Sequence, residues 1–334
     1  MVCRRSAVSR GGNAGAKRCM VAALAAFMTA AAMPALAENE DDYPSRLVQV
    51  VNPFPAGSTT DGLARGLARG LSTRLGREFV INNKPGASGG IGTLTVATAA
   101  PDGYTLLFAP AVVLSVIPVE QRNMGFSLSD FVPVCRTFVN QMVLAAPADS
   151  RLNSLADLVA EAKQRPGQLN YGHQGISSIP HIAMEQFLQT AGIDITGVPF
   201  RGEPLLVTEL LASRIDVASL VLGSAAGHDF HLLGVFGEER NPAFPNVPTV
   251  KEQGFDIAPT SFGGLFAPAQ TPKPIVAKLA AACEGAARDA VYAEAAKRAF
   301  QPQSYYADRD TFARELQRDV DDKKQILSQM KKTQ

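Results

Sequence analysis

The sequence has little of three things: long apolar runs, cysteine and histidine. Its longest apolar run, over residues 20–35, is shorter than the roughly 20 residues that a membrane-spanning helix needs, so no permanent anchor is predicted. In the body of the chain only Cys135 and Cys283 occur, and we expect two buried free thiols rather than a disulfide. His228 and His231 have a spacing usable by a metal ion, but no cysteine or third histidine completes a cluster, so no metal site is predicted.

The N-terminus combines basic residues, an apolar run and small residues, in the order typical of a secretory signal peptide. Five basic residues precede the apolar run, which ends close to Ala35-Leu36-Ala37. We therefore predict that residues 1–37 are removed by cleavage after Ala37 and that the protein is periplasmic. Without those five basic residues the formal net charge falls from +1 to −4, which argues against a nucleic-acid partner.

Short β-rich segments alternate with helical patterns along the rest of the chain, which is typical of parallel βαβ units. The expected strands are residues 47–52, 78–82, 105–108, 142–146, 169–172, 196–199, 217–221, 232–236 and 263–267. The expected helices are residues 61–75, 91–99, 178–190, 205–212, 274–287 and 310–330. The basic residues of the last helix alternate with acids, so we expect Lys323 to lie on a solvated face.

This alternation predicts an α/β protein of two lobes. We place lobe I at residues 43–142 plus 266–334 and lobe II at residues 143–265. The apolar strands 142–146 and 263–267 each end at a proline and are our candidates for the two crossings of a hinge.

Two loops join a strand to a helix through small or polar residues. A helix start carries unpaired N–H groups and a positive dipole end, so such loops suit a carboxylate. N-capping by Thr60 or Asp61 explains the first loop equally well. The candidate ligand-binding residues are Phe54, Ala56, Gly57, Ser58, Thr59 and Thr60 in the first loop and His173, Gln174, Ser177 and Ser178 in the second.

Several motifs together carry a family resemblance. They are Pro53-Phe54-Pro55-Ala56-Gly57, Asn83-Lys84-Pro85-Gly86-Ala87, Ala100-Pro101-Asp102-Gly103-Tyr104, Pro199-Phe200-Arg201-Gly202, Pro245-Asn246-Val247-Pro248-Thr249 and Gly264-Leu265-Phe266-Ala267-Pro268. In them the chain resembles the Bug-type periplasmic solute-binding proteins of tripartite tricarboxylate transporters. The resemblance implies a type II periplasmic-binding-protein fold with a two-crossing hinge, a small carboxylate ligand held by these loops, and membrane permease subunits as partners. We expect a monomer.

Three departures from the family pattern bear on the ligand. His173 and Gln174 are bulkier than the small residues of many relatives, and His173 is a candidate titrating contact. Relatives that bind amino acids typically carry an acid soon after the segment matching residues 215–217, where this chain has Ala218-Ser219-Leu220-Val221, which argues against an ammonium-bearing ligand. The apolar segment 108–114 favours a ligand with an aromatic part.

Two alternative functions remain beside the solute-binding protein. The segment Pro85–Gly92 resembles the glycine loop of a short-chain-dehydrogenase-like NAD(P) oxidoreductase, but no tyrosine has a lysine four residues later. No Gly-x-Ser-x-Gly elbow accompanies Ser177 or Ser178 either. We therefore predict a protein that is not an enzyme and needs no cofactor. The other alternative is a carboxylate-sensing extracytoplasmic domain, which would use the same fold.

Overall fold

The structure is a computed structural model that describes residues 42–120, 123–259, 261–302 and 305–330. The predicted signal peptide and its cleavage after Ala37 lie outside the described residues. The chain from Tyr43 onward forms one compact unit. Within the described ranges, no helix is both long and apolar enough to cross a membrane.

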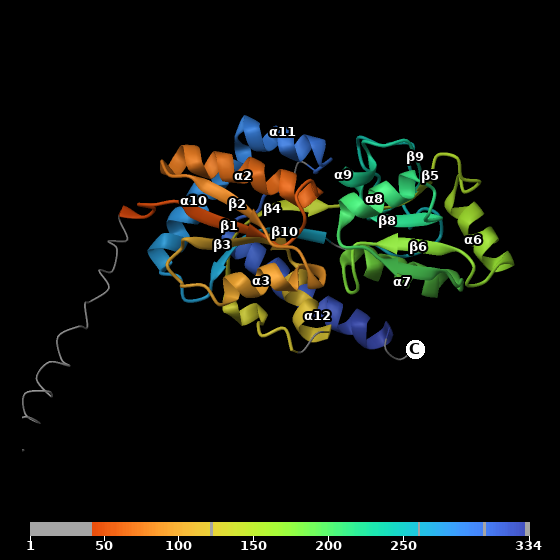
Figure 1. Ribbon diagram of the computed structural model, residues 1–334, viewed down its shortest axis with the longest axis horizontal. Coiled ribbons are helices and arrows are strands. Elements are labelled where there is room, and N and C mark those ends of the chain that lie inside the picture. Colours follow the sequence, from red (N-terminus) through yellow and green to blue (C-terminus); the bar gives the residue numbers. More distant parts are fainter. Residues whose placement is uncertain (1–41, 121–122, 260, 303–304, 331–334) are drawn as a thin grey trace, which may run out of the picture. The chain divides into compact units, whose positions relative to one another are not determined.

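Two five-stranded sheets form the centre of this unit (Figure 1). The first has the order β2-β1-β3-β10-β4, and the second has the order β7-β6-β8-β5-β9. The strands of the first sheet are β1 (Val48–Asn52), β2 (Phe79–Asn83), β3 (Thr105–Pro110), β4 (Phe131–Asn140) and β10 (Ser261–Pro268). Those of the second are β5 (Met142–Pro147), β6 (Asn170–His173), β7 (Thr196–Pro199), β8 (Val217–Val221) and β9 (Phe230–Phe236). The two-lobed α/β architecture that the sequence predicted is confirmed.

Both sheets are built in the same way. In the first sheet β2, β1 and β3 run parallel, and β10 is antiparallel to its neighbours β3 and β4. In the second sheet β7, β6 and β8 run parallel, and β5 is antiparallel to β8 and β9. The antiparallel strand is in each case the one that enters from the other sheet. This is the strand order of a type II periplasmic-binding-protein fold.

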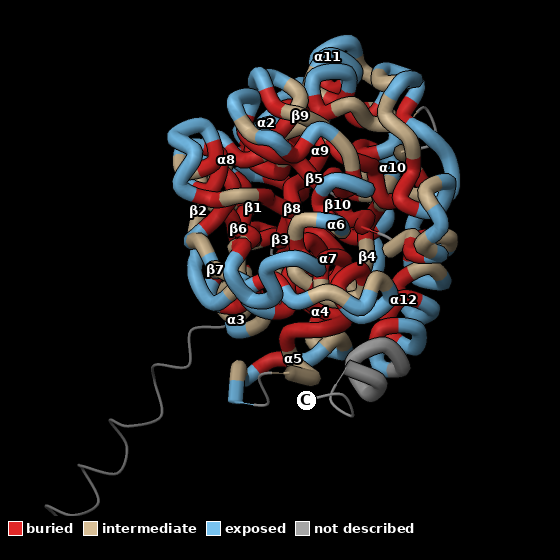
Figure 2. Tube along the Cα trace, turned by 90° about the vertical axis from the view of Figure 1, so that its right-hand side faces the viewer, coloured by how far each residue is buried: buried red, intermediate tan, exposed pale blue. Residues whose placement is uncertain are grey.

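Helices cover both faces of each sheet. Those packed with the first sheet are α2 (Thr59–Leu75), α3 (Gly90–Ala97), α4 (Val112–Ser115), α5 (Ile117–Glu120), α10 (Lys273–Arg288), α11 (Ala290–Arg298) and α12 (Arg309–Met330). Those of the second are α6 (Leu155–Gln164), α7 (Ile179–Ala191), α8 (Glu203–Leu211) and α9 (Leu222–Ala225). Successive strand residues alternate between faces: Val50 packs in the cluster under α2 and α10, whereas Val51 packs in the cluster that contains α3. Figure 2 shows the strands as a continuous buried centre beneath exposed helix faces.

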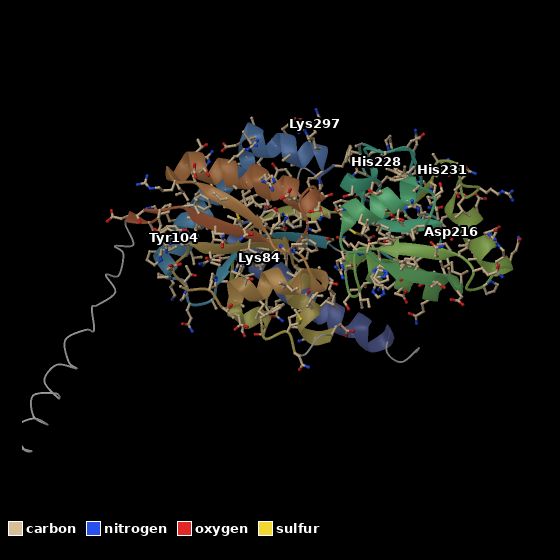
Figure 3. All side chains as sticks on the ribbon, in the orientation of Figure 1. Lys84, Tyr104, Asp216, His228, His231 and Lys297 are labelled. Atoms are coloured by element: carbon tan, nitrogen blue, oxygen red, sulfur yellow. A yellow bond between two sulfur atoms is a disulfide. The ribbon has the colours of Figure 1, made fainter. Side chains whose placement is uncertain are left out.

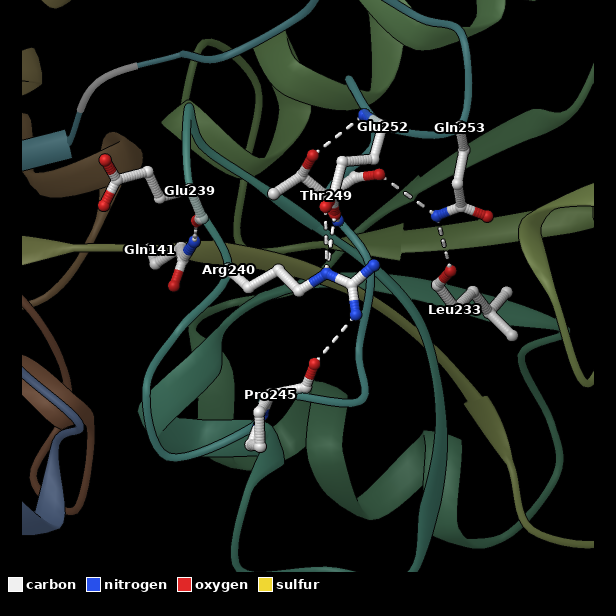
Figure 4. A network of polar contacts seen from close by, with 8 residues as sticks. All are labelled: Gln141, Leu233, Glu239, Arg240, Pro245, Thr249, Glu252 and Gln253. Carbon is white, nitrogen blue, oxygen red and sulfur yellow. Dashed lines mark hydrogen bonds and ion pairs between the residues drawn. The ribbon is translucent and has the colours of Figure 1, made fainter.

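The chain passes between the sheets at Gln141 and again in the segment that follows β9. A polar network orders that segment: Arg240 donates to Glu252 Oε2 at 2.8 Å and to the carbonyl of Pro245 at 2.8 Å (Figure 4). Gln141 donates to the carbonyl of Glu239 at 3.0 Å, which ties the first crossing to the beginning of the segment that follows β9.

The hinge strands proposed from sequence are therefore placed differently. Strands β5 and β10 are buried along their whole length and are hydrogen-bonded on both sides, and the crossings precede them. The predicted lobe boundary at 265/266 falls inside β10, and Met142 belongs to the second sheet. The apolar character of these strands reflects their central position in a sheet rather than a hinge.

The expectation of two free thiols is wrong. Cys135 on β4 and Cys283 on α10 form a disulfide, with their Cα atoms 6.5 Å apart. Both cysteines are fully buried, as expected, but they meet because α10 packs across β4. Their separation of 148 residues in the chain gave no hint of this contact.

The expectation of a solvated Lys323 is also wrong. Its side chain is buried and pairs with Asp319, which in turn accepts a hydrogen bond from Ser115 Oγ at 2.6 Å. This buried pair fixes α12 against α4.

Candidate ligand-binding cleft

The first candidate loop ends in a well-capped helix start. Ser58 is the N-cap of α2, and its Oγ accepts from the backbone N–H of Asp61 at 3.3 Å. Asp61 Oδ2 accepts from the N–H of Gly57 at 3.0 Å and from Arg65 at 3.0 Å. Burial alone would raise the pKa of Asp61, but these hydrogen bonds and one from Asn83 hold the pKa below its ordinary value. The helix is therefore N-capped, but the cap is Ser58; Thr60 and Asp61, which the sequence analysis considered as caps, lie within the helix.

The second candidate loop has the same construction. Ser178 is the N-cap of α7, and its Oγ accepts from the N–H of His181 at 3.4 Å. His181 Nδ1 accepts from the N–H of Ser177 at 3.2 Å, so this histidine supports the helix start. Ser177 has a φ of 63°, in the left-handed region that a residue with a side chain seldom adopts. Backbone strain of this kind is concentrated at binding sites.

His173 lies beneath this loop. Its ring is buried between Tyr171 and His181, with the centroids of the two histidine rings 4.5 Å apart. Its Nδ1 lies 2.9 Å from the carbonyl of Gly175. Burial lowers the pKa of His173 to about 4, and the neighbouring His181 acts in the same direction. His173 is thus neutral at neutral pH and positions the loop.

A third loop, which the sequence interpretation overlooked, brings an acid to the same place. Helix α8 begins at Glu203, which is 3% exposed. Glu203 Oε2 accepts from Ser224 Oγ at 2.6 Å and from the N–H of Thr59 at 3.3 Å. Burial raises the pKa of Glu203, and the hydrogen bonds from Ser224 and Thr59 oppose that rise. The signal was present in Pro199-Phe200-Arg201-Gly202, which follows a strand and opens a helix like the other two loops.

These three loops line two connected cavities. We call the smaller the inner cavity; it has a volume of about 20 Å³, enough for about one water molecule. Its lining comprises Phe54, Thr60, Ser88, Pro110, Val112, Asn140, Met142, Gln174, Ser178, Ile179, Pro180, Glu203, Val221 and Ser261. The larger, called the outer groove, has a volume of about 780 Å³ and shares Phe54, Ser88 and Gln174 with the inner cavity. The full lining of the outer groove comprises residues 53–55, 85–89, 91, 174–176 and 199–202.

The ten candidate residues fall into three groups. Phe54, Thr60, Gln174 and Ser178 line the inner cavity. Gly57, Ser58 and Thr59 line a side cavity of about 410 Å³ on the other side of Glu203. Ala56 is exposed, whereas His173 and Ser177 are buried and hold the second loop in shape.

Close contacts join the two lobes at the outer groove and at the side cavity. Ser88 Oγ donates to the carbonyl of Ile176 at 2.7 Å, and Thr59 Oγ1 lies 2.7 Å from Ser224 Oγ. A Cβ atom at Gly175 would lie 2.7 Å from Ser88 Oγ, so only glycine permits this approach. Ser88 itself has a φ of 53°. The glycine-rich segment Pro85–Gly92 therefore borders the cleft.

The histidine pair considered for a metal lies elsewhere. Figure 3 shows His228 and His231 on the second lobe. His231 Nδ1 lies 3.1 Å from the carbonyl of Leu152, and the His228 ring packs near Phe230. Among the described residues, no three histidine, cysteine or acidic side chains are grouped to hold a metal ion.

Two α/β lobes that meet over a cleft lined by helix starts define a solute-binding protein of the periplasmic type. Comparison with known proteins agrees. The chain matches the model of the tripartite tricarboxylate transporter family receptor over residues 63–331. It is 36% identical over 247 residues to the protein BugT of Bordetella pertussis, a match that covers 71% of this chain and 75% of BugT.

Solved structures show the same architecture. The periplasmic binding protein BugD superposes with a TM-score of 0.81 at 27% identity, covering 86% of this chain and 98% of BugD. Rpa4515 of R. palustris with adipate gives a TM-score of 0.81 at 28% identity, with 86% and 98% covered. The chain belongs to the tripartite tricarboxylate transporter receptor family and is of the Bug type. It is a periplasmic solute-binding receptor and not an enzyme, so the dehydrogenase alternative is wrong.

Proposed function

We propose that this receptor captures a small carboxylate in the cleft and presents it to the permease subunits of a tripartite tricarboxylate-type transporter. It acts as a monomer after export and removal of residues 1–37. The observation that carries the proposal is that Thr60, at the start of α2, and Ser178, at the start of α7, line one cavity from opposite lobes. Hydroxyl groups and helix starts are suited to a carboxylate.

Apolar side chains complete the same cavity. Phe54, Pro110 and Val112 line it on the side of the first lobe. They provide a surface for an apolar or aromatic part of the ligand, while the polar groups bind the carboxylate. The adipate bound to Rpa4515 is a carboxylate with an apolar chain, which supports this division.

Binding proceeds by closure of the two lobes. The inner cavity is too small for any carboxylate, so the ligand enters when the lobes move apart at the two crossings. The closed form is favoured to the extent that the ligand contacts both lobes at once. Gln141 and the segment after β9 are the places where this movement is expected.

A thermal-shift screen tests the proposal. The mature protein from Glu38 onward is heated with a panel of carboxylic acids, with sugars and nicotinamide dinucleotides as controls. A ligand at a hundred times its Kd stabilises the folded state by about 2.7 kcal/mol. We expect one or a few acids to raise the unfolding midpoint by several degrees, and a shift given by dinucleotides alone would contradict the proposal.

A matched pair of variants locates the site. Ser178→Ala and Ser154→Ala each remove an N-cap hydroxyl, from α7 and α6, and each should lower stability by about 1 kcal/mol. Only Ser178 lines the inner cavity, so only Ser178→Ala should also reduce the shift given by the acid. Equal loss of the shift in both variants would mean that the acid binds elsewhere.

A further inference from the structure

Glu203 is the acid that the second lobe places inside the cleft. It lines both the inner cavity and the side cavity, and its carboxylate bridges Thr59 of the first lobe and Ser224 of the second. Its Oε1 atom is 3.5 Å from Gln174 Nε2, a long contact, and Gln174 lines the inner cavity. This oxygen therefore lies toward the space that the ligand enters.

The groups that stabilise Glu203 are all uncharged. Its hydrogen-bond donors are the hydroxyl-bearing residues Thr59 and Ser224, the side-chain amide of Gln174 and backbone N–H groups. The residues that line the inner cavity include neither lysine nor arginine. A buried carboxylate is expensive unless an opposite charge accompanies it. The inner part of the cleft thus contains one carboxyl group, and the residues that line it provide no positive charge beside that group.

Glu203 also occupies the position that a ligand carboxylate would otherwise take. The N–H of Thr59 belongs to the first turn of α2 and already donates to Glu203. A second carboxylate at this helix start would lie against the first. The ligand carboxylate is better accommodated at the start of α7, where Ser178 and Ser88 line the inner cavity and Arg201 lines the adjoining outer groove.

We propose that Glu203 selects carboxylates that also carry an ammonium or another cationic nitrogen, with that nitrogen bound at Glu203 and the carboxylate at the start of α7. The inference rests on the proposed function and narrows its ligand to a zwitterion. The acid that the sequence analysis sought soon after residues 215–217 is supplied instead by the start of α8. The segment Ala218-Ser219-Leu220-Val221, which lies within β8, is therefore no argument against an ammonium group.

Isothermal titration calorimetry with paired ligands tests the inference. Each pair differs by the replacement of one carboxylate with an ammonium: succinate with β-alanine, glutarate with γ-aminobutyrate, and adipate with δ-aminovalerate. The wild-type protein should bind the ammonium-bearing member at least about tenfold more tightly. This comparison needs no variant, so it holds whether or not a substitution disturbs folding.

The variant Glu203→Gln removes the charge and keeps the shape. It should weaken binding of the ammonium-bearing acid by about 10- to 100-fold, and it should leave binding of the dicarboxylate as tight or make it tighter, because the second carboxylate no longer lies against an acid. Glu209→Gln is the matched control, because Glu209 lies on the same helix but pairs with Arg214 outside the cleft. It should change neither affinity.

The outcomes separate the two proposals. If an acid binds but the ammonium-bearing partner binds no better, or if Glu203→Gln weakens both members equally, the inference is overturned and the proposed function stands. If no carboxylic acid of either panel binds, the proposed function is wrong as well.

Discussion

His173 is a residue whose chemistry is changed by its packing. An unperturbed histidine has a pKa near 6.5, but burial beside His181 lowers the pKa of His173 to about 4. The sequence suggested a titrating ligand contact, whereas the ring lies beneath the loop and is neutral at neutral pH. The Nδ1 atom of His173 lies 2.9 Å from the carbonyl oxygen of Gly175, and this contact holds the turn that brings Gln174 to the cleft.

We predict that His173 makes the folded protein less stable in mild acid. The unfolded chain takes up a proton at this residue near pH 6.5 and the folded protein only near pH 4, so the unfolded state holds more protons between these values. Stability therefore falls as the pH falls through this window, by about 3 kcal/mol in total from this group. Urea denaturation at several pH values measures the slope.

The variant His173→Phe isolates this contribution. It keeps an aromatic ring in the stack and removes the titrating group, so its stability should depend less on pH between 6.5 and 4 than that of the wild type. His181, with a pKa lowered by burial, and Glu203, with a pKa raised by burial, remain in both proteins, so the difference between the two curves reports His173 together with its coupling to His181. Parallel curves for the two proteins would contradict the assignment.

At the scale of helices and strands, the disulfide joins an edge strand to a helix. Removing it with the double variant Cys135→Ala/Cys283→Ala should cost about 2–4 kcal/mol, because the unfolded chain is no longer cross-linked. Thermal unfolding with and without reductant measures this loss. Reductant should lower the midpoint of the wild type and leave the double variant unchanged; two titratable thiols in the denatured, unreduced protein would contradict the bond.

Most elements could be predicted from the sequence, because their apolar residues follow the period of a helix or a strand. The helix expected over 274–287 is α10 (Lys273–Arg288), and the strands expected over 196–199 and 217–221 are β7 and β8. Strand β4 was missed, since it contains Pro133, which has no N–H to donate and is typical of an edge or a break. The structure places β4 at the edge of the first sheet.

Contacts between elements could not be predicted in this way. At Gly264 a Cβ atom would lie 2.0 Å from the carbonyl oxygen of Cys135, so glycine is what lets β10 approach β4. The sequence shows the glycine but not its neighbour. The same limit explains why Glu203 was overlooked in the cleft: its partners, Thr59 and Ser224, are brought to it only by the fold.

At the scale of the whole molecule, a few hydrogen bonds between the lobes bias the protein toward closure. The double variant Thr59→Val/Ser88→Ala removes two of them, from Thr59 to Ser224 and from Ser88 to Ile176. Each is worth about 0.5–1.5 kcal/mol, so the closed form should lose about 1–3 kcal/mol. Small-angle X-ray scattering should then give a larger radius of gyration, and ligand affinity should fall.

The control for this variant removes hydroxyls of the same type elsewhere. Thr95 and Thr190 each bond within their own helix, so Thr95→Val/Thr190→Val should leave the radius of gyration and the affinity unchanged. If the two double variants behave alike, the bonds between the lobes do not govern closure.

The disulfide has a further consequence for the integrity of the receptor. The whole second sheet, from Met142 to Phe236, lies in the chain between Cys135 and Cys283. A protease that cuts once within this inserted lobe divides the chain into two fragments, yet each fragment retains one cysteine of the bond. The two halves of the first lobe thus stay covalently attached, and a nicked receptor separates into its fragments only after reduction.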